Sequence, residues 1–470
     1  METQSQPSRL VVPIVTAGVL LVSLDLFIVN VALAPISRDL ASRGLGAVSW
    51  VLNGYAIVYA ALLVLFGRLA DQHNRRSGFL LGVTVFVLAS AACGAADSVG
   101  MLIAFRVVQA AGAALLTPTS LALVLAATAP ERRHGAVRAW TAVGGIGAAL
   151  GPVAGGLLVA LSWRWVFLVN VPIGLAALAA GVRWLPSLPG HPGPRPDVRG
   201  AVLITGGVGA LALGLVQGHT WGWGSPATVA VLAGATAALA AFVARCLRGV
   251  NPLVPPALFK ARAFTGAAFV ATVFSIAFGA MLLSIVLWEQ TAWGWSPLRT
   301  GLAIAPGPAM VPVFAFLIAG RAIARWGPGP VAGAGATVYA AGAIWWSLAI
   351  GTHPDYLGGA LPGMLMTGIG VGLTLPTYMA TAAASLPPAS FATGSAVVNM
   401  LRQIGLAIGV AVLVAVLGTP AGQLARLHAF EHGWVTIAAL SLVSAVVGAA
   451  VLPGRARLAP DPRELSLQVE

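Results

Sequence analysis

Residues 19–33 read VLLVSLDLFIVNVAL, a membrane span interrupted by one carboxyl group, that of Asp25. They belong to an apolar run from Leu10 to Leu33 in which no cation lies close to Asp25 in sequence. An ionised carboxylate at the centre of a bilayer costs at least about 2.5 kcal/mol. Asp25 is therefore a candidate functional residue. The alternative is a carboxyl group kept protonated or paired inside a helix bundle for packing alone.

The composition places this stretch in an integral membrane protein. The chain has 470 residues, of which 58% are hydrophobic and 8% charged, and its mean hydropathy is +0.91. A soluble protein carries roughly 25% charged residues. The net charge of +13 could indicate nucleic-acid binding, but the basic residues lie between the apolar runs, as the positive-inside rule expects. Cys93 and Cys246 lie within apolar runs and away from histidines, so we expect neither a disulfide nor a metal site.

Apolar runs of about 20 residues predict an all-α polytopic protein with fourteen spans. They are residues 10–33, 46–67, 79–96, 101–123, 139–161, 165–185, 200–217, 226–246, 264–288, 300–320, 330–351, 358–381, 392–418 and 432–452. The arginine distribution predicts that both termini are cytoplasmic. The first run is long enough to span and lacks an A-x-A exit, so we expect no cleavable signal peptide.

Two polar breaks divide the spans into groups of six, two and six. Proline and glycine are frequent in residues 185–200, and a second break covers residues 251–264. We predict an N-terminal six-helix bundle in residues 1–185, a connector with two additional helices in 186–250, and a C-terminal bundle with a short tail in 251–470. A basic segment that begins with Gly-Arg follows the second span of each six-span group, GRLADQHNRR at residues 67–76 and GRAIARWGPG at 320–329, as expected for a duplicated bundle.

The segment GRLADQHNRR (67–76) resembles the loop signature of the major facilitator superfamily. We expect a tight turn at Gly67, with Asp71 capping or pairing at a helix end and with Arg75 and Arg76 holding one side closed through breakable ion pairs. Asn74 stands where the family usually has glycine, and asparagine also tolerates the left-handed conformation. The alternative is an ordinary positive-inside loop.

Two further spans carry family-like motifs. LIAFRVVQAAGAAL (102–115) resembles the superfamily's second motif, and its Arg106 must face a cavity, a carboxylate such as Asp25, or carbonyl groups; the alternative is snorkelling to the interface. AVGGIGAALGPVAGGLL (142–158) resembles the antiporter signature of drug-exporting major facilitators. Its three glycines, Gly147, Gly151 and Gly155, lie on one helix face, and Pro152 adds a bend. The structural interpretation, a stripe of small residues for close helix packing, holds as well, because the motif works by packing.

Four more stretches resemble the fourteen-span drug:proton antiporter family. They are LDLFIVNVALAP (24–35), SWRWVFLVNVPIG (162–174), EQTAWGWSPLRTG (289–301) and NMLRQIGLAIGVA (399–411). The resemblance covers nearly the whole chain. It implies the major facilitator fold and a monomeric exporter in the cytoplasmic membrane, surrounded by lipid. It also implies that the exporter is driven by the proton gradient without a cofactor and moves hydrophobic or amphipathic drugs or antibiotics.

Proton coupling requires a titratable group inside the membrane. We expect all seven histidines in loops, which leaves Asp25 and Glu289 as the acids near the interior. Asp25 would exchange a proton under the influence of Arg106. Glu289 is either an acid at the outer mouth for cationic drugs or an interfacial residue. The candidate substrate-binding residues are aromatics and amides on spans that should face the centre, although each of them also suits helix packing; they are Phe27, Asn30, Tyr55, Tyr378, Asn399 and Gln403.

The sequence therefore predicts proton-coupled export of drugs by alternating access. The nearest alternative is a major facilitator that moves another small solute, such as an amino acid, a sugar or a siderophore. A membrane-embedded enzyme would need a cluster of His, Asp or Ser at one membrane depth, and a channel would need polar rings; the sequence predicts neither.

Overall fold

The computed structural model describes residues 10–40, 44–128, 133–188, 196–387 and 390–452. Within these ranges every regular element is a helix, and thirteen helices are long and apolar enough to cross a membrane. A further helix, α5 (Arg133–Leu161), lies at the predicted fifth span. The all-α polytopic fold predicted from the sequence is confirmed.

The elements follow the predicted spans in order. They are α1 (Val11–Asp39), α2 (Leu45–Gln72), α3 (Arg75–Gly94), α4 (Val99–Ala127), α5, α6 (Trp165–Leu168), α7 (Asn170–Trp184), α8 (Val198–Trp221), α9 (Pro226–Arg248), η2 (Pro256–Lys260), α10 (Arg262–Thr291), α11 (Pro297–Ile304), α12 (Pro306–Pro312), η3 (Val313–Ala319), α13 (Gly320–Trp326), α14 (Pro328–Ala349), η4 (Tyr356–Ala360), α15 (Leu361–Ala384), α16 (Phe391–Leu417) and α17 (Gln423–Val451).

Local sequence explains where these helices begin and break. Ser98, Ser225 and Ser296 each precede a helix, and each hydroxyl accepts a hydrogen bond from the backbone N–H three residues later, which is the usual N-cap arrangement. The tenth span is divided because Pro306 and Pro312 lack the N–H that a continuous helix needs. The π-helical η3 follows directly.

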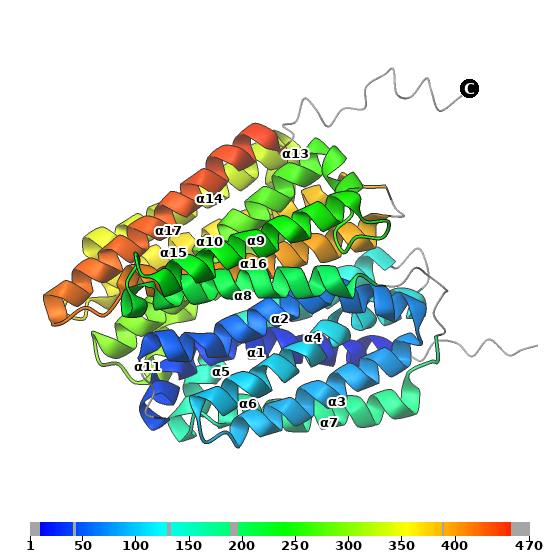
Figure 1. Ribbon diagram of the computed structural model, residues 1–470, viewed down its shortest axis with the longest axis horizontal. Helices are drawn as coiled ribbons and strands as arrows, with labels where there is room; N and C mark the ends of the chain where they lie inside the picture. The colour runs from blue at the N-terminus through cyan, green and yellow to red at the C-terminus, as the bar shows by residue number, and fades with distance from the viewer. Residues whose placement is uncertain (1–9, 41–43, 129–132, 189–195, 388–389, 453–470) are drawn as a thin grey trace, which may run out of the picture.

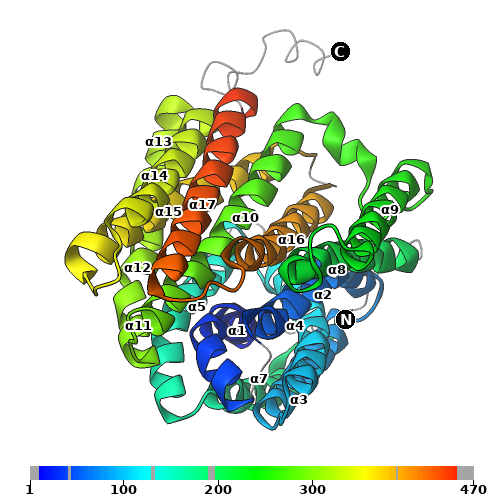
Figure 2. The same cartoon turned by 60° about the vertical axis from the view of Figure 1, so that its left-hand side comes forward.

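The N-terminal helices gather on one side of the molecule, and α14, α15 and α17 lie on the other (Figures 1 and 2). The additional helix α8 lies between α2 and α16, with α9 beside it. The Nε2 atom of His219 on α8 is 2.6 Å from the carbonyl oxygen of Ala415 on α16. A Cβ atom on Gly46 of α2 would lie 3.2 Å from Val216 of α8. The helix α8 thus contacts both the N-terminal half, which comprises α1 to α7, and the C-terminal half, which comprises α10 to α17.

A buried carboxylate ties the two additional helices to the second polar break. Asp197 precedes α8, and its Oδ1 atom accepts from the N–H of Gly200 at 2.9 Å and from Nε of Arg245 at 2.7 Å, while Oδ2 accepts from the N–H of Leu253 at 3.1 Å. Burial raises the pKa of Asp197, but these donors lower it by more, so the pKa lies below its ordinary value. Arg68 of α2 donates to the carbonyl of Pro252 at 2.8 Å, which extends this cluster to the N-terminal half.

Candidate functional site

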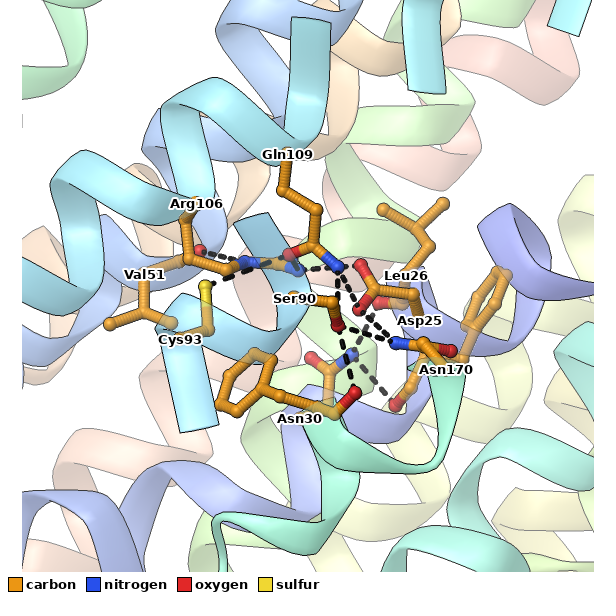
Figure 3. Close-up of polar contacts among 11 residues, drawn as sticks. Asp25, Leu26, Asn30, Val51, Ser90, Cys93, Arg106, Gln109 and Asn170 are labelled. Carbon is orange, nitrogen blue, oxygen red and sulfur yellow. Dashed lines mark hydrogen bonds and ion pairs between the residues drawn. The ribbon is translucent and has the colours of Figure 1, made fainter. Parts of the chain in front are cut away.

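Asp25 lies in a fully buried ion pair at the centre of the N-terminal helices. Its Oδ2 atom accepts a hydrogen bond of 2.5 Å from Nη1 of Arg106 on α4, and neither side chain is exposed (Figure 3). The interpretation of Arg106 as a partner of Asp25 therefore fits the structure, whereas snorkelling to the interface does not, because the guanidinium has no solvent exposure.

Three uncharged polar side chains complete the surroundings of Asp25 (Figure 3). Gln109 on α4 and Asn170 on α7 donate to Oδ1 of Asp25 at 2.9 Å and 3.1 Å. Both amides also donate to the hydroxyl of Ser90 on α3, each at 3.1 Å, and that hydroxyl donates to the carbonyl of Phe167 at 2.8 Å. The polar side chains of this cluster thus come from α1, α3, α4 and α7. No role was predicted for Ser90, Gln109 or Asn170, although Gln109 follows Arg106 by three residues and so shares its helix face.

Arg106 has partners on several sides. Its Nε donates to the carbonyl of Val51 at 3.2 Å, and Nη1 also donates to Oε1 of Gln109 at 2.8 Å. The guanidinium carbon lies 4.0 Å from the ring centre of Tyr55, in a cation–π contact. Its Nη2 atom bonds none of the described residues. Tyr55 thus packs on Arg106, and its predicted contact with substrate stays a prediction.

The glycine stripe of α5 packs against α1 beside Asp25. A Cβ atom added to these glycines would have its nearest atom of α1 at 2.7–3.0 Å, closer than ordinary carbon contacts. The nearest atoms are Ser23 Cβ at 3.0 Å for Gly147, Phe27 Cβ at 2.7 Å for Gly151 and Ile28 O at 2.9 Å for Gly155. The stripe therefore fixes the position of the α1 segment that carries Asp25.

The same part of α5 also meets the C-terminal half. A Cβ atom on Gly301 of α11 would lie 2.5 Å from the carbonyl oxygen of Pro152, and one on Gly156 would lie 2.8 Å from the carbonyl oxygen of Pro297. One helix thus joins the surroundings of Asp25 to the contact between the halves. This contact lies toward the distal face, which we define as the face where α1 ends and α2 begins.

Two cavities lie between the halves. A central cavity of about 40 Å³ is lined by residues of α1, α2, α4, α10 and α16. Phe27 and Asn30, both predicted to contact substrate, line it together with Asn53 and Arg106. A distal vestibule of about 430 Å³ lies at the distal helix ends, and its lining includes Arg38 and Arg426. Only the vestibule falls in the 300–1,000 Å³ range of ligand pockets.

The other predicted substrate residues lie elsewhere. Tyr378 and Gln403 are buried, and Asn399 donates to the carbonyl of Ser395 at 3.1 Å; none of them lines either of these two cavities. Their role in binding stays a prediction.

Glu289 is fully buried near the distal end of α10, not at an exposed interface. Among the described residues, neither carboxylate oxygen of Glu289 accepts a hydrogen bond of ordinary length and angle. Glu289 also lines neither of the two cavities. Its neighbour Gln290 donates to the carbonyl of Val31 on α1 at 3.1 Å. This hydrogen bond joins the two halves.

The predicted turn at Gly67 is wrong. Gly67 lies inside α2, and the chain leaves that helix at His73. Asn74 is not left-handed but is the N-cap of α3, with φ −65° and ψ 116°, and its side chain accepts from the N–H groups of Arg76 and Ser77. The cap supplies the break that glycine was expected to supply, so α2 continues for five residues beyond Gly67.

The basic pair of this segment contacts the last turn of α7 and the residues that follow that helix. Arg76 donates through Nη2 to the carbonyl of Val182, and the backbone N–H of Arg75 donates to the carbonyl of Leu188 at 3.0 Å. The side chain of Asp71 lies outside the described part of the structure, so its pairing stays a prediction.

The expectation that all histidines lie in loops is also wrong. His134 lies in α5, His219 lies in α8, and His428 and His432 lie in α17. The reason is that α17 begins at Gln423, nine residues before the apolar run, so its polar first turns are helical too.

Comparisons with known proteins identify the family. The profile of the Major Facilitator Superfamily matches residues 15–410. The chain is 33% identical to the tetracenomycin C resistance and export protein of Streptomyces glaucescens, over 94% of this chain and 83% of that protein. It is 36% identical to the cephamycin export protein CmcT of Amycolatopsis lactamdurans, over 94% and 91%, and 36% identical to the puromycin resistance protein of Streptomyces alboniger, over 89% and 83%.

Solved structures show the same fold. A D-xylose–proton symporter superposes with a TM-score of 0.69 at 13% identity, over 94% of this chain and 98% of that one. A peptide transporter in complex with sulfate gives 0.69 at 16% identity, over 95% and 96%. At these identities the likeness concerns the fold alone.

Proposed function

The chain belongs to the major facilitator superfamily, and from that premise we propose that it exports a hydrophobic or amphipathic antibiotic or drug in exchange for protons. Relatives at 33–36% identity are named for resistance to, or export of, tetracenomycin C, cephamycin and puromycin. The observation that carries the proton-coupled part of the proposal is the fully buried pair of Asp25 and Arg106. Ionisable residues inside a membrane are costly, and they commonly mark proton relays and substrate or ion pathways.

The proposed cycle starts from the charge balance of this pair. A proton on Asp25 removes the negative charge that faces Arg106, whereas the guanidinium keeps its own charge. The segment of α1 around Asp25 is packed against α5, and α5 meets α11 across the two halves. A rearrangement at Asp25 is thereby passed to the contact between the halves, so protonation favours one of two packings.

Alternating access supplies the direction. In the outward-facing form Asp25 takes up a proton and drug is released; in the inward-facing form the proton leaves and drug binds. The central cavity is far smaller than a ligand pocket, so the halves must separate to admit a drug. The proposal includes a position in the cytoplasmic membrane with both termini in the cytoplasm, a monomeric state, and no cofactor.

Uptake into everted membrane vesicles tests the proposal. Vesicles carrying the protein are given a pH gradient, and the uptake of labelled puromycin and of tetracenomycin C is followed. We expect gradient-driven uptake by the native protein and its loss in Asp25→Asn. The matched control is Asp97→Asn, the same change at an exposed loop residue. Undiminished uptake by Asp25→Asn would remove Asp25 from the coupling role. A second experiment expresses the protein in a pump-deficient host, and unchanged susceptibility of that host to a varied drug panel would contradict drug export.

A further inference from the structure

Asn53 is a buried amide in the wall of the central cavity. Its side chain on α2 has no solvent exposure, and neither Oδ1 nor Nδ2 bonds any residue in the part of the chain that the structure describes. Buried polar groups are nearly always hydrogen-bonded, and an unsatisfied one costs about 1–3 kcal/mol. Asn30, in the same wall, differs because it already donates to the carbonyls of Leu26 and Phe27. Asn53 is thus a donor and an acceptor held ready for a ligand.

The charge of the cavity restricts what that ligand can be. Among the described residues that line it, Arg106 is the only charged one, and its charge is balanced by Asp25, which lies outside the lining. A charged substrate would therefore find no counter-ion in the central cavity, and burying an unpaired charge is costly. The distal vestibule adds to this restriction, because the charged residues among its described lining are Arg38 and Arg426. The described charged residues that line the two cavities are therefore all cationic.

The opposite wall offers no polar recognition. The residues that α10 and α16 contribute are apolar or glycine, such as Leu282 and Leu406. Polar recognition in this cavity therefore comes from the N-terminal half, with Asn53 as its unsatisfied amide, while the C-terminal half supplies apolar surface.

We propose that Asn53 determines specificity by bonding an uncharged substrate through a carbonyl, amide or hydroxyl group, and that lipophilic cations are excluded. This inference rests on the proposed export function, because it names the class of compound that the central cavity accepts. Asn53→Leu removes the donor and the acceptor at similar size. Asn53→Asp adds the acid that the cavity lacks.

Equilibrium binding to the purified protein in nanodiscs tests this assignment. The probes are labelled chloramphenicol, which is uncharged and carries an amide and hydroxyl groups, and tetraphenylphosphonium, a lipophilic cation. The native protein should bind chloramphenicol at least about tenfold more tightly. Asn53→Leu should weaken chloramphenicol binding by about tenfold, the equivalent of one or two hydrogen bonds, and leave the cation unaffected. Asn53→Asp should strengthen cation binding by about tenfold.

The control is Asn251→Asp, which adds the same charge at an exposed residue outside the cavity and should change neither affinity. If Asn53→Asp does not fold, Asn53→Leu still decides the matter. Equal affinity of the native protein for both probes, no binding of chloramphenicol, or unchanged binding by Asn53→Leu would overturn the proposal. Failure of the export function looks different, because chloramphenicol would then bind with this preference but would not be moved into everted vesicles by a pH gradient.

Discussion

Removing either member of the Asp25–Arg106 pair should destabilise the protein, but the two changes should not be equivalent. Asp25→Asn leaves a guanidinium that cannot lose its charge and that has no solvent exposure. Arg106→Gln leaves a carboxyl group that can take up a proton and become neutral. We therefore expect Asp25→Asn to be the more damaging substitution, although it changes fewer atoms.

The contacts give the magnitude. Breaking a buried pair so that a charge remains costs about 3–5 kcal/mol. In Asp25→Asn a further conflict arises, because Arg106 donates to Oδ2 while Gln109 and Asn170 donate to Oδ1. An amide has only one oxygen, so its NH₂ group must face a donor in either orientation. Arg106→Gln keeps both amide donors bonded to Asp25 and should cost about 1–3 kcal/mol, the range for lost hydrogen bonds.

Thermal unfolding of the purified proteins in nanodiscs of one lipid composition, followed by tryptophan fluorescence, measures the order of stability of the native protein and these variants. The midpoint should fall from the native protein to Arg106→Gln and further to Asp25→Asn. The double variant Asp25→Asn/Arg106→Gln should be more stable than Asp25→Asn alone, because it removes the uncompensated charge; such non-additivity is expected for residues in contact. A midpoint for Asp25→Asn equal to or above that of Arg106→Gln would refute the reasoning.

Three further outcomes follow from other contacts. Gly151→Ala places a Cβ atom 2.7 Å from α1. We expect it to lower the free energy of unfolding by about 1–3 kcal/mol and to reduce uptake into vesicles. The control Gly209→Ala, whose Cβ atom meets nothing within 4 Å, should change neither. Asp197→Asn should lower the unfolding midpoint at neutral pH. Because folding lowers the pKa of Asp197, its stabilisation is present at pH values above the unfolded pKa of about 3.9. It is lost as pH falls through the folded pKa, so the difference in midpoint should shrink in acid. Gln290→Leu removes the hydrogen bond that joins Gln290 to Val31 of the other half. A thiol reagent added from the distal side should then label more rapidly a cysteine introduced into the wall of the central cavity.

The sequence predicted both charged members of the buried pair, Asp25 and Arg106, but not the uncharged residues that bond to them. A charge inside an apolar run is conspicuous because its transfer is so costly, and this drew attention to Asp25 and Arg106. Ser90, Gln109 and Asn170 are uncharged and come from three helices, and single polar residues of this kind are common in membrane helices. Only the fold brings them to one carboxylate, so their convergence is not visible in any one span.

The errors at helix ends have a different cause. Gly67 and the histidines of α17 were assigned from local composition, which predicts a break where polar residues or glycine begin. Helices continue past the apolar segment when the following residues can still satisfy the backbone internally, and α2 ends only where Asn74 caps the next helix. Helix ends thus depend on caps as well as on hydropathy.

The position of Asp25 relative to the central cavity changes how coupling can work. Asp25 lines neither of the two cavities, whereas Phe27 and Asn30, also on α1, line the central one. Among the described residues that bond Asp25, only Arg106 also lines that cavity. A drug therefore need not displace the proton sterically. Competition between them must pass through the charge and position of Arg106, so a substrate that contacts Asn53 can be uncharged and still respond to protonation of Asp25.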